Sequence, residues 1–94
     1  MSFRVKYLEG AREELGQIDP RTELRIRAKI ESVLAINPHP HGNVVRRISG
    51  VSPPLSRIRI GDWRAFFIID AGEVLVASVV KKEKAERTIR RLRR

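Results

Sequence analysis

The sequence predicts an α+β fold in which a small antiparallel sheet packs against a helical hairpin and a basic helix follows. Two patterns predict this fold. Apolar residues recur at helical spacing between residues 9 and 37, whereas residues 55–80 form three consecutive strand-like runs separated by two-residue turns. The chain has 94 residues, of which 41% are hydrophobic, and this content suffices for one core. We therefore expect a single domain over residues 1–94.

The first half of the chain begins with a short strand and a short helix. Apolar and polar side chains alternate over residues 3–8, which is typical of a half-buried strand. An amphipathic helix follows, because Ala11, Leu15 and Ile18 repeat at helical spacing. We expect the first strand to join an edge of the sheet that the later strands form.

A second helix is predicted to begin after Asp19, which supplies an N-cap, while Pro20 suits the first turn. This helix should end at Asn37, because the residue before Pro38 is pushed out of the α region. Its buried stripe is expected to comprise Ile26, Ile30, Val33 and Leu34. Residues 38–53 contain three prolines and two glycines, so they read as an extended connection.

The second half of the chain changes to strands. In residues 55–60, apolar side chains alternate with Arg57 and Arg59, so one face of the strand is apolar and both arginines project from the other. Gly61–Asp62 has glycine first, as a type II′ hairpin turn requires. The remaining strands and the turn between them are residues 63–70, Ala71–Gly72 and residues 74–80.

Positive charge is concentrated at the end of the sequence. The formal net charge is +9, and residues 81–94 carry eight basic and two acidic side chains. Ala85, Ile89 and Leu92 mark the apolar face of a helix whose other positions are mostly basic. Such a charge distribution attracts polyanions, nucleic acid above all.

Composition argues against several other classes of protein. There is no cysteine, hence no disulfide framework, and no apolar run approaches the roughly 18 residues that a membrane span needs. Charged residues interrupt the first apolar stretch, so a signal peptide is not expected. We expect a cytoplasmic protein without a membrane partner. His39 and His41 lie in the connection with no nearby acidic residue, which predicts no metal ion and no cofactor.

The run LSRIRIGDWRAFFIIDAGEVLVASVVKK, residues 55–82, resembles the core of the RelE/ParE superfamily of bacterial and archaeal toxins. The recurrent family pattern is arginine, any residue, GDYR and then apolar residues around an aspartate, and the matching stretch here is residues 57–64, RIRIGDWR. The order of strand, helical hairpin and strands agrees over nearly the whole chain. The resemblance implies a toxin that is held by an antitoxin. The RelE branch, which we favour, cleaves messenger RNA on the ribosome, whereas the ParE branch poisons DNA gyrase.

The RelE resemblance implies a catalytic set of cations, namely Arg57, Arg59, Arg64 and Lys82. Arg57 and Arg59 occupy positions where RelE-like nucleases carry basic residues, and two guanidinium groups on one sheet face can clamp a phosphodiester. Arg64 matches the family arginine that contacts the scissile phosphate. Lys82 aligns with a position, usually arginine, that supports the leaving group. Further RNA contacts are expected from Lys81, Lys84, Arg87, Arg90 and Arg91.

Each of these residues also has a plain structural interpretation. Arg57 and Arg59 could be ordinary solvated arginines, and Arg64 could pair across strands with Asp62 or Asp70. The basic residues that follow the last strand could form a solvated helix start. Trp63 could stack on a base, although an aromatic residue at this hairpin position more commonly packs into the core.

The catalytic set lacks an obvious base. Attack by a 2′-hydroxyl needs a proton acceptor, and arginine is a poor one because it stays protonated. RelE-like nucleases often carry a tyrosine in the last segment, where this chain has Thr88. The lysine cluster or Glu83 is the available substitute. The RelE resemblance thus implies a metal-independent endoribonuclease, and the incomplete catalytic set implies low activity. The alternatives are a ParE-like gyrase-binding toxin without nuclease activity and a non-toxic basic RNA-binding protein.

Overall fold

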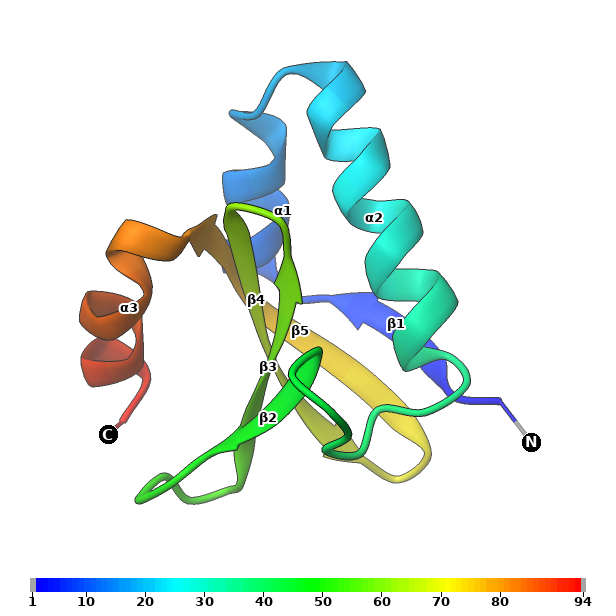
Figure 1. Ribbon diagram of the computed structural model, residues 1–94, viewed down its shortest axis with the longest axis vertical. Coiled ribbons are helices and arrows are strands. Elements are labelled where there is room, and N and C mark those ends of the chain that lie inside the picture. The colour runs from blue at the N-terminus through cyan, green and yellow to red at the C-terminus, as the bar shows by residue number, and fades with distance from the viewer. Residues whose placement is uncertain (1, 94) are drawn as a thin grey trace.

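The computed structural model describes residues 2–93 as a mixed five-stranded sheet with three α-helices (Figure 1). The elements are β1 (Arg4–Tyr7), α1 (Glu9–Gly16), α2 (Pro20–Leu34), β2 (Val45–Ile48), β3 (Leu55–Ile60), β4 (Trp63–Asp70), β5 (Glu73–Lys81), a 3₁₀ turn (Lys82–Lys84) and α3 (Ala85–Leu92). The strand order in the sheet is β1-β5-β4-β3-β2. This arrangement confirms the predicted α+β class.

The sheet differs from the prediction in one strand and one pairing. Residues 38–53 were expected to be an extended connection, but they contain β2, which pairs antiparallel with β3 at the edge of the sheet. Its short sequence, VRRI, buries only Val45 fully and so lacks the apolar alternation of an internal strand. The predicted sheet was antiparallel, whereas β1 runs parallel to β5 at the other edge.

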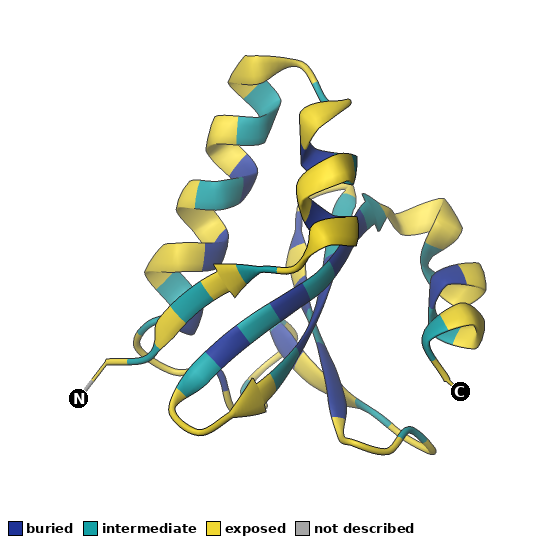
Figure 2. Ribbon diagram, turned by 180° about the vertical axis from the view of Figure 1, so that it is seen from behind, coloured by how far each residue is buried: buried dark blue, intermediate teal, exposed yellow. Residues whose placement is uncertain are grey.

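The helical hairpin covers one face of the sheet (Figure 2). The side chain of Asp19 caps α2 by accepting a hydrogen bond from the Thr22 N–H at 3.1 Å, with Pro20 as the first helical residue, as predicted. Of the predicted stripe, Ile26, Ile30 and Leu34 are buried and Val33 is half-buried against the core. The core partners on the sheet include Ile58, Ile60, Ala65, Phe67, Val74, Val76 and Val79.

The opposite face of the sheet is covered only in part. The register between β4 and β5 shifts by one residue between Phe66 and Phe67. Phe66 lies opposite Ser78 and Phe67 lies opposite Val76, so Ala77 has no partner on β4. Phe67 belongs to the core under the helical hairpin, whereas Phe66 points to the other face and is also fully buried. On that face α3 packs over β5, where Arg91 contacts Ser78 at 3.4 Å. None of the helices within residues 2–93 is long and apolar enough to cross a membrane.

Candidate functional site: an arginine face on the open side of the sheet

Four arginines gather on the sheet face opposite the helical hairpin. Arg57 and Arg59 alternate along β3 with residues that are buried in the core, so both point away from α2. The strand register places Arg46 of β2 opposite Arg57, and Arg64 of β4 opposite Arg59. We call these four residues the arginine face. The structure therefore brings together three of the four predicted catalytic residues.

The arginine face holds concentrated positive charge. Arg57 and Arg64 are half-buried, while Arg46 and Arg59 are exposed. Within residues 2–93, no carboxylate forms an ion pair with any of the four, so the Arg64 pairing with an aspartate that the sequence suggested is not formed. Burial, followed by the charges of Arg64, Arg46 and Arg59, lowers the pKa of Arg57 below its ordinary value. Arginine nevertheless stays protonated at neutral pH.

Backbone carbonyls hold two of these guanidinium groups in place. Arg64 donates hydrogen bonds from Nη1 to the carbonyl oxygens of Gly61 and Trp63, both at 2.8 Å, and Arg57 donates to the carbonyl of Asn43 at 3.3 Å. Each contact uses only part of the five-donor capacity of a guanidinium. The remaining N–H groups are available for an anionic ligand.

Lys82, the fourth predicted catalytic residue, lies beside the β3–β4 turn. Its backbone N–H donates to the carbonyl of Asp62 at 2.8 Å, and its Nζ is 3.6 Å from Asp62 Oδ1. Arg64 contacts the same turn through Gly61. Lys82 and Arg64 therefore meet at one turn, but Lys82 is paired with a carboxylate there, unlike the residues of the arginine face.

Arg46 was not among the predicted site residues, because the strand that carries it was read as a loop. A signal was present in the sequence, since Arg46 and Arg47 directly follow Val45, the residue that β2 buries. A short strand with one buried residue has too little alternation to be recognised by periodicity. Arg46 joins the site only through its pairing with β3.

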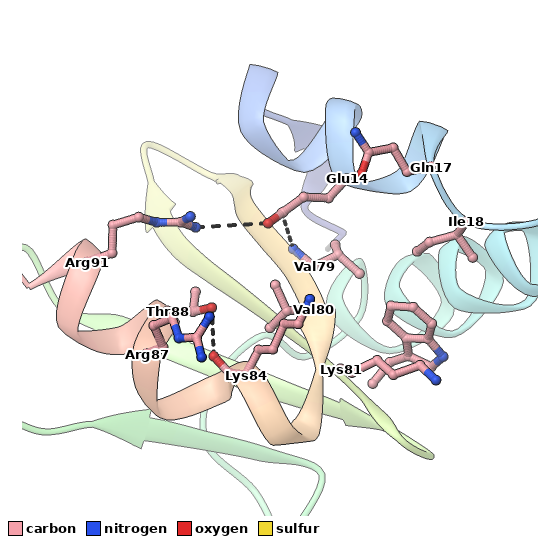
Figure 3. Close-up of a pocket in the computed structure, with 11 residues that line it drawn as sticks. Glu14, Gln17, Ile18, Val79, Val80, Lys81, Lys84, Arg87, Thr88 and Arg91 are labelled. Atoms are coloured by element: carbon pink, nitrogen blue, oxygen red, sulfur yellow. Dashed lines mark hydrogen bonds and ion pairs between the residues drawn. The ribbon is translucent and has the colours of Figure 1, made fainter.

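The predicted RNA-binding residues lie on both sides of α3. Lys81, Lys84, Arg87 and Arg91 line a groove between α1, the end of β5 and α3 (Figure 3). Arg90 lies apart from them, in a shallow depression that Glu86, Ile89 and Arg93 also line. Four of these five cations thus line a groove that none of the four residues of the arginine face lines.

No tyrosine serves the open face within residues 2–93. Tyr7 lies on β1, and its hydroxyl donates a hydrogen bond to Glu31 of α2 at 2.8 Å. Burial and this hydrogen bond raise the pKa of Tyr7 above its ordinary value. Thr88, at the position where the family often has tyrosine, is buried and donates to the carbonyl of Lys84 at 2.9 Å. Neither hydroxyl faces the arginines.

Within residues 2–93, neither histidine is hydrogen-bonded to an arginine of this face, although His41 and Arg46 line the same depression. His41 has its Nε2 3.1 Å from the carbonyl of Asn37, and His39 packs edge-on against Phe3. Among the residues described, no group of three histidine, cysteine, aspartate or glutamate side chains is placed to hold a metal ion. Through its guanidinium groups the arginine face can bind and polarise a phosphodiester, which is electrostatic rather than acid–base chemistry.

Comparison with solved structures defines the fold. Against an archaeal RelE–RelB complex from Pyrococcus horikoshii OT3, the TM-score is 0.70 at 20% sequence identity, over 87% of this chain and 97% of that chain. The RelBE2 toxin–antitoxin complex of Mycobacterium tuberculosis gives a TM-score of 0.69 at 19% identity, over 87% and 100%. A double arginine-to-alanine variant of the Escherichia coli toxin RelE in the free state gives 0.68 at 20%, over 98% and 99%.

These likenesses show that the chain has a RelE-like toxin fold. No family model and no curated protein matches the sequence. The fold predicted from the hairpin motif of residues 57–64 is thus confirmed by structure.

Proposed function

We propose that this protein is the toxin of a type II toxin–antitoxin system and acts as a ribosome-dependent, metal-independent endonuclease of messenger RNA. The observation that carries the proposal is the arginine face, where four guanidinium groups that have no carboxylate partner among residues 2–93 lie on the open side of a RelE-like fold. Like charges held together without neutralisation destabilise a folded protein, so their clustering favours a polyanionic ligand.

Arg57, Arg59, Arg64 and Lys82 would share the work of cleavage. Guanidinium groups bind the non-bridging oxygens of a phosphodiester and stabilise the charge that develops in the transition state. Lys82, beside the β3–β4 turn, would support the leaving oxygen. The proton acceptor is absent from the arginine face itself, and this absence predicts slow cleavage. Arg46 extends the face and would bind a neighbouring phosphate of the message.

A cognate antitoxin is the expected protein partner. Two of the solved structures that share this fold are RelE–RelB type complexes. An antitoxin that covers the arginine face would need acidic or polar side chains, because the face carries four positive charges.

A gyrase-binding toxin is the second candidate, and one observation favours it. Thr88 is buried and bonded to the carbonyl of Lys84, so α3 offers no acid–base group where the nucleases often have tyrosine. A toxin that binds gyrase without cutting RNA would not need one. A non-toxic RNA-binding protein on the same fold is the third candidate.

Controlled expression without an antitoxin separates the three candidates. We expect growth arrest with translation halted and with messages cut on ribosomes. Growth arrest with DNA breaks and intact messages would replace the nuclease by the gyrase-binding toxin. Normal growth would leave the non-toxic RNA-binding protein.

A further inference from the structure

The groove between α1, the end of β5 and α3 has a composition of its own (Figure 3). Its volume is about 530 Å³, within the range of ligand sites. Lys81, Lys84, Arg87 and Arg91 contribute four positive charges, and Glu14 is the single carboxylate in the lining. We call this feature the basic groove.

The basic groove is distinct from the arginine face. None of the four arginines of that face lines the groove. Helix α3 packs on β5 between the two regions. Its groove side carries Arg87 and Arg91, while Arg93 on its other side donates a hydrogen bond to the carbonyl of Ser49, beyond β2, at 3.3 Å. A ligand in the groove would therefore not occupy the proposed catalytic face.

The strand edge at the floor of the groove is closed to strand addition. Parallel pairing with β1 ends at Val76, which would leave the following part of β5 with a free edge. Glu14 closes it, because its carboxylate accepts hydrogen bonds from the Val79 N–H at 2.8 Å and from Ser78 Oγ at 2.9 Å. A peptide that added to this edge as a strand would have to displace Glu14. A ligand in the groove would therefore contact side chains rather than the backbone of β5.

Those side chains suit single-stranded RNA. Trp63, the only tryptophan of the protein, is half-buried against the core, and its remaining surface lines the groove together with Ile18. The Nζ of Lys81 lies 5.6 Å from the centroid of its ring, so the ring already accommodates a cation. Lys84, at the end of the 3₁₀ turn, and Arg87 of α3 are exposed and line the same groove. An aromatic platform next to a row of cations is the usual combination for binding a nucleic-acid strand, because every base offers a flat face.

We infer that the basic groove is a second RNA-binding site, which takes single-stranded RNA with one base against Trp63 and the adjoining phosphates on Lys84 and Arg87. Lys81 would move from the ring to a phosphate when the base stacks. That the RNA is the message being cut rests on the proposed function, whereas binding itself does not. A strand that occupies both regions would be held on each side of α3, and this would fix its register on the arginine face.

Tryptophan fluorescence of the isolated protein tests this inference without ribosomes. Titration with hexauridylate in low salt should quench the Trp63 emission, since base stacking brings the two ring systems into contact. Lys84→Ala and Arg87→Ala should each weaken binding about fivefold, because each removes one phosphate contact. Both side chains are exposed, so these variants should fold normally.

Matched controls come from α2, which does not line the groove. Lys29→Ala and Arg21→Ala remove the same charges from exposed helical positions and should weaken binding by less than about twofold, through the general field alone. Equal losses in groove and control variants would overturn the inference, because attraction would then be delocalised. The same conclusion would follow if hexauridylate bound without changing the Trp63 emission.

Three further outcomes are decisive. If hexaglutamate displaced the oligonucleotide as readily as a second oligonucleotide does, the groove would bind an acidic peptide and the RNA site would be rejected. If quenching and its dependence on Lys84 and Arg87 were observed in a protein that cut no message, the groove would stand and the nuclease proposal would fail. If the protein cut messages but hexauridylate did not quench the Trp63 emission, the RNA site in the groove would be rejected and the nuclease proposal would stand.

Discussion

The two faces of strands β3 and β4 differ in composition, although alternate residues of the same two strands form them. On the covered face, Ile58 and Phe67 are fully buried beneath the helical hairpin. On the open face, the intervening positions carry Arg57, Arg59 and Arg64. Burial of apolar area stabilises the first face, whereas the second adds repulsion between like charges. Folding energy and ligand binding are thus supplied by alternate residues of the same strands.

Removal of a large side chain from the covered face should have the greatest effect on the protein. Phe67→Ala deletes a fully buried ring from the core and should lower the free energy of unfolding by about 3–5 kcal/mol. Urea denaturation followed by circular dichroism measures this change. A loss below about 1 kcal/mol would mean that the core around Phe67 is not packed as described.

The open face should show the reverse pattern, with a large effect on activity and little on stability. Arg59→Ala or Arg64→Ala should lower the saturated cleavage rate on programmed ribosomes more than about tenfold, since transition-state charge is stabilised only by donors held close to it. The free energy of unfolding should change by less than about 1 kcal/mol. Removal of one arginine relieves repulsion among the remaining positive charges, and this should offset any loss of stability.

Lys29→Ala is the matched control for the open-face variants, because it removes an exposed charge from α2, remote from the arginine face. Its cleavage rate should stay within about twofold of the parent. If Arg64→Ala cut messages as fast as the parent, the open face would not be a catalytic site, and the gyrase-binding candidate would gain support.

The smallest expected effect is at the cap of α2, on the covered side. The hydrogen bonds from Thr22 lower the pKa of Asp19 below its ordinary value of 3.8. A lowered carboxyl pKa in the folded state adds stability above the ordinary pKa, and this stability is lost as the pH falls through the lowered value. The Tm of Asp19→Ala should therefore lie below the parental Tm at neutral pH, and the gap should narrow in acid.

Asp19→Asn is the control for this pH dependence. Asparagine keeps an oxygen that can accept from Thr22 but carries no charge, so its Tm should stay close to the parental Tm at neutral pH. A gap between Asp19→Ala and the parent that is equally large in acid would show that the charge of Asp19 does not contribute.

Periodicity predicted most of this fold, because long apolar runs and special turn residues are local signals. Gly61 and Gly72 have positive φ angles of 57° and 79° at the predicted hairpin turns, as such turns require. The short edge strand β2 was not predicted, since its pairing with β3 depends on tertiary contacts rather than on its own sequence pattern. With β2 unseen, Arg46 could not be placed beside Arg57.

The candidate site was predictable in part. The spacing of Arg57 and Arg59 by two residues was enough to put both on one face, and in the hairpin Arg64 lies opposite Arg59. The contacts of Lys82 with Asp62 were not readable from the sequence. Nor was the basic groove, because it brings Glu14 of α1 to Ser78 of β5 and Arg91 of α3, residues far apart in the chain.

The parallel pairing of β1 with β5 determines when the sheet can be completed during synthesis of the chain. Arg4 lies opposite Glu73 and Tyr7 opposite Val76. The first strand of the chain, β1, therefore cannot pair until the last strand, β5, has been made. Contacts between such distant segments carry a large entropic cost of loop closure and form late in folding. On a translating ribosome, β1 therefore has no partner strand until residues 73–81 have left the exit tunnel. A protein proposed to stop ribosomes would thus be kept from acting on the one that is making it.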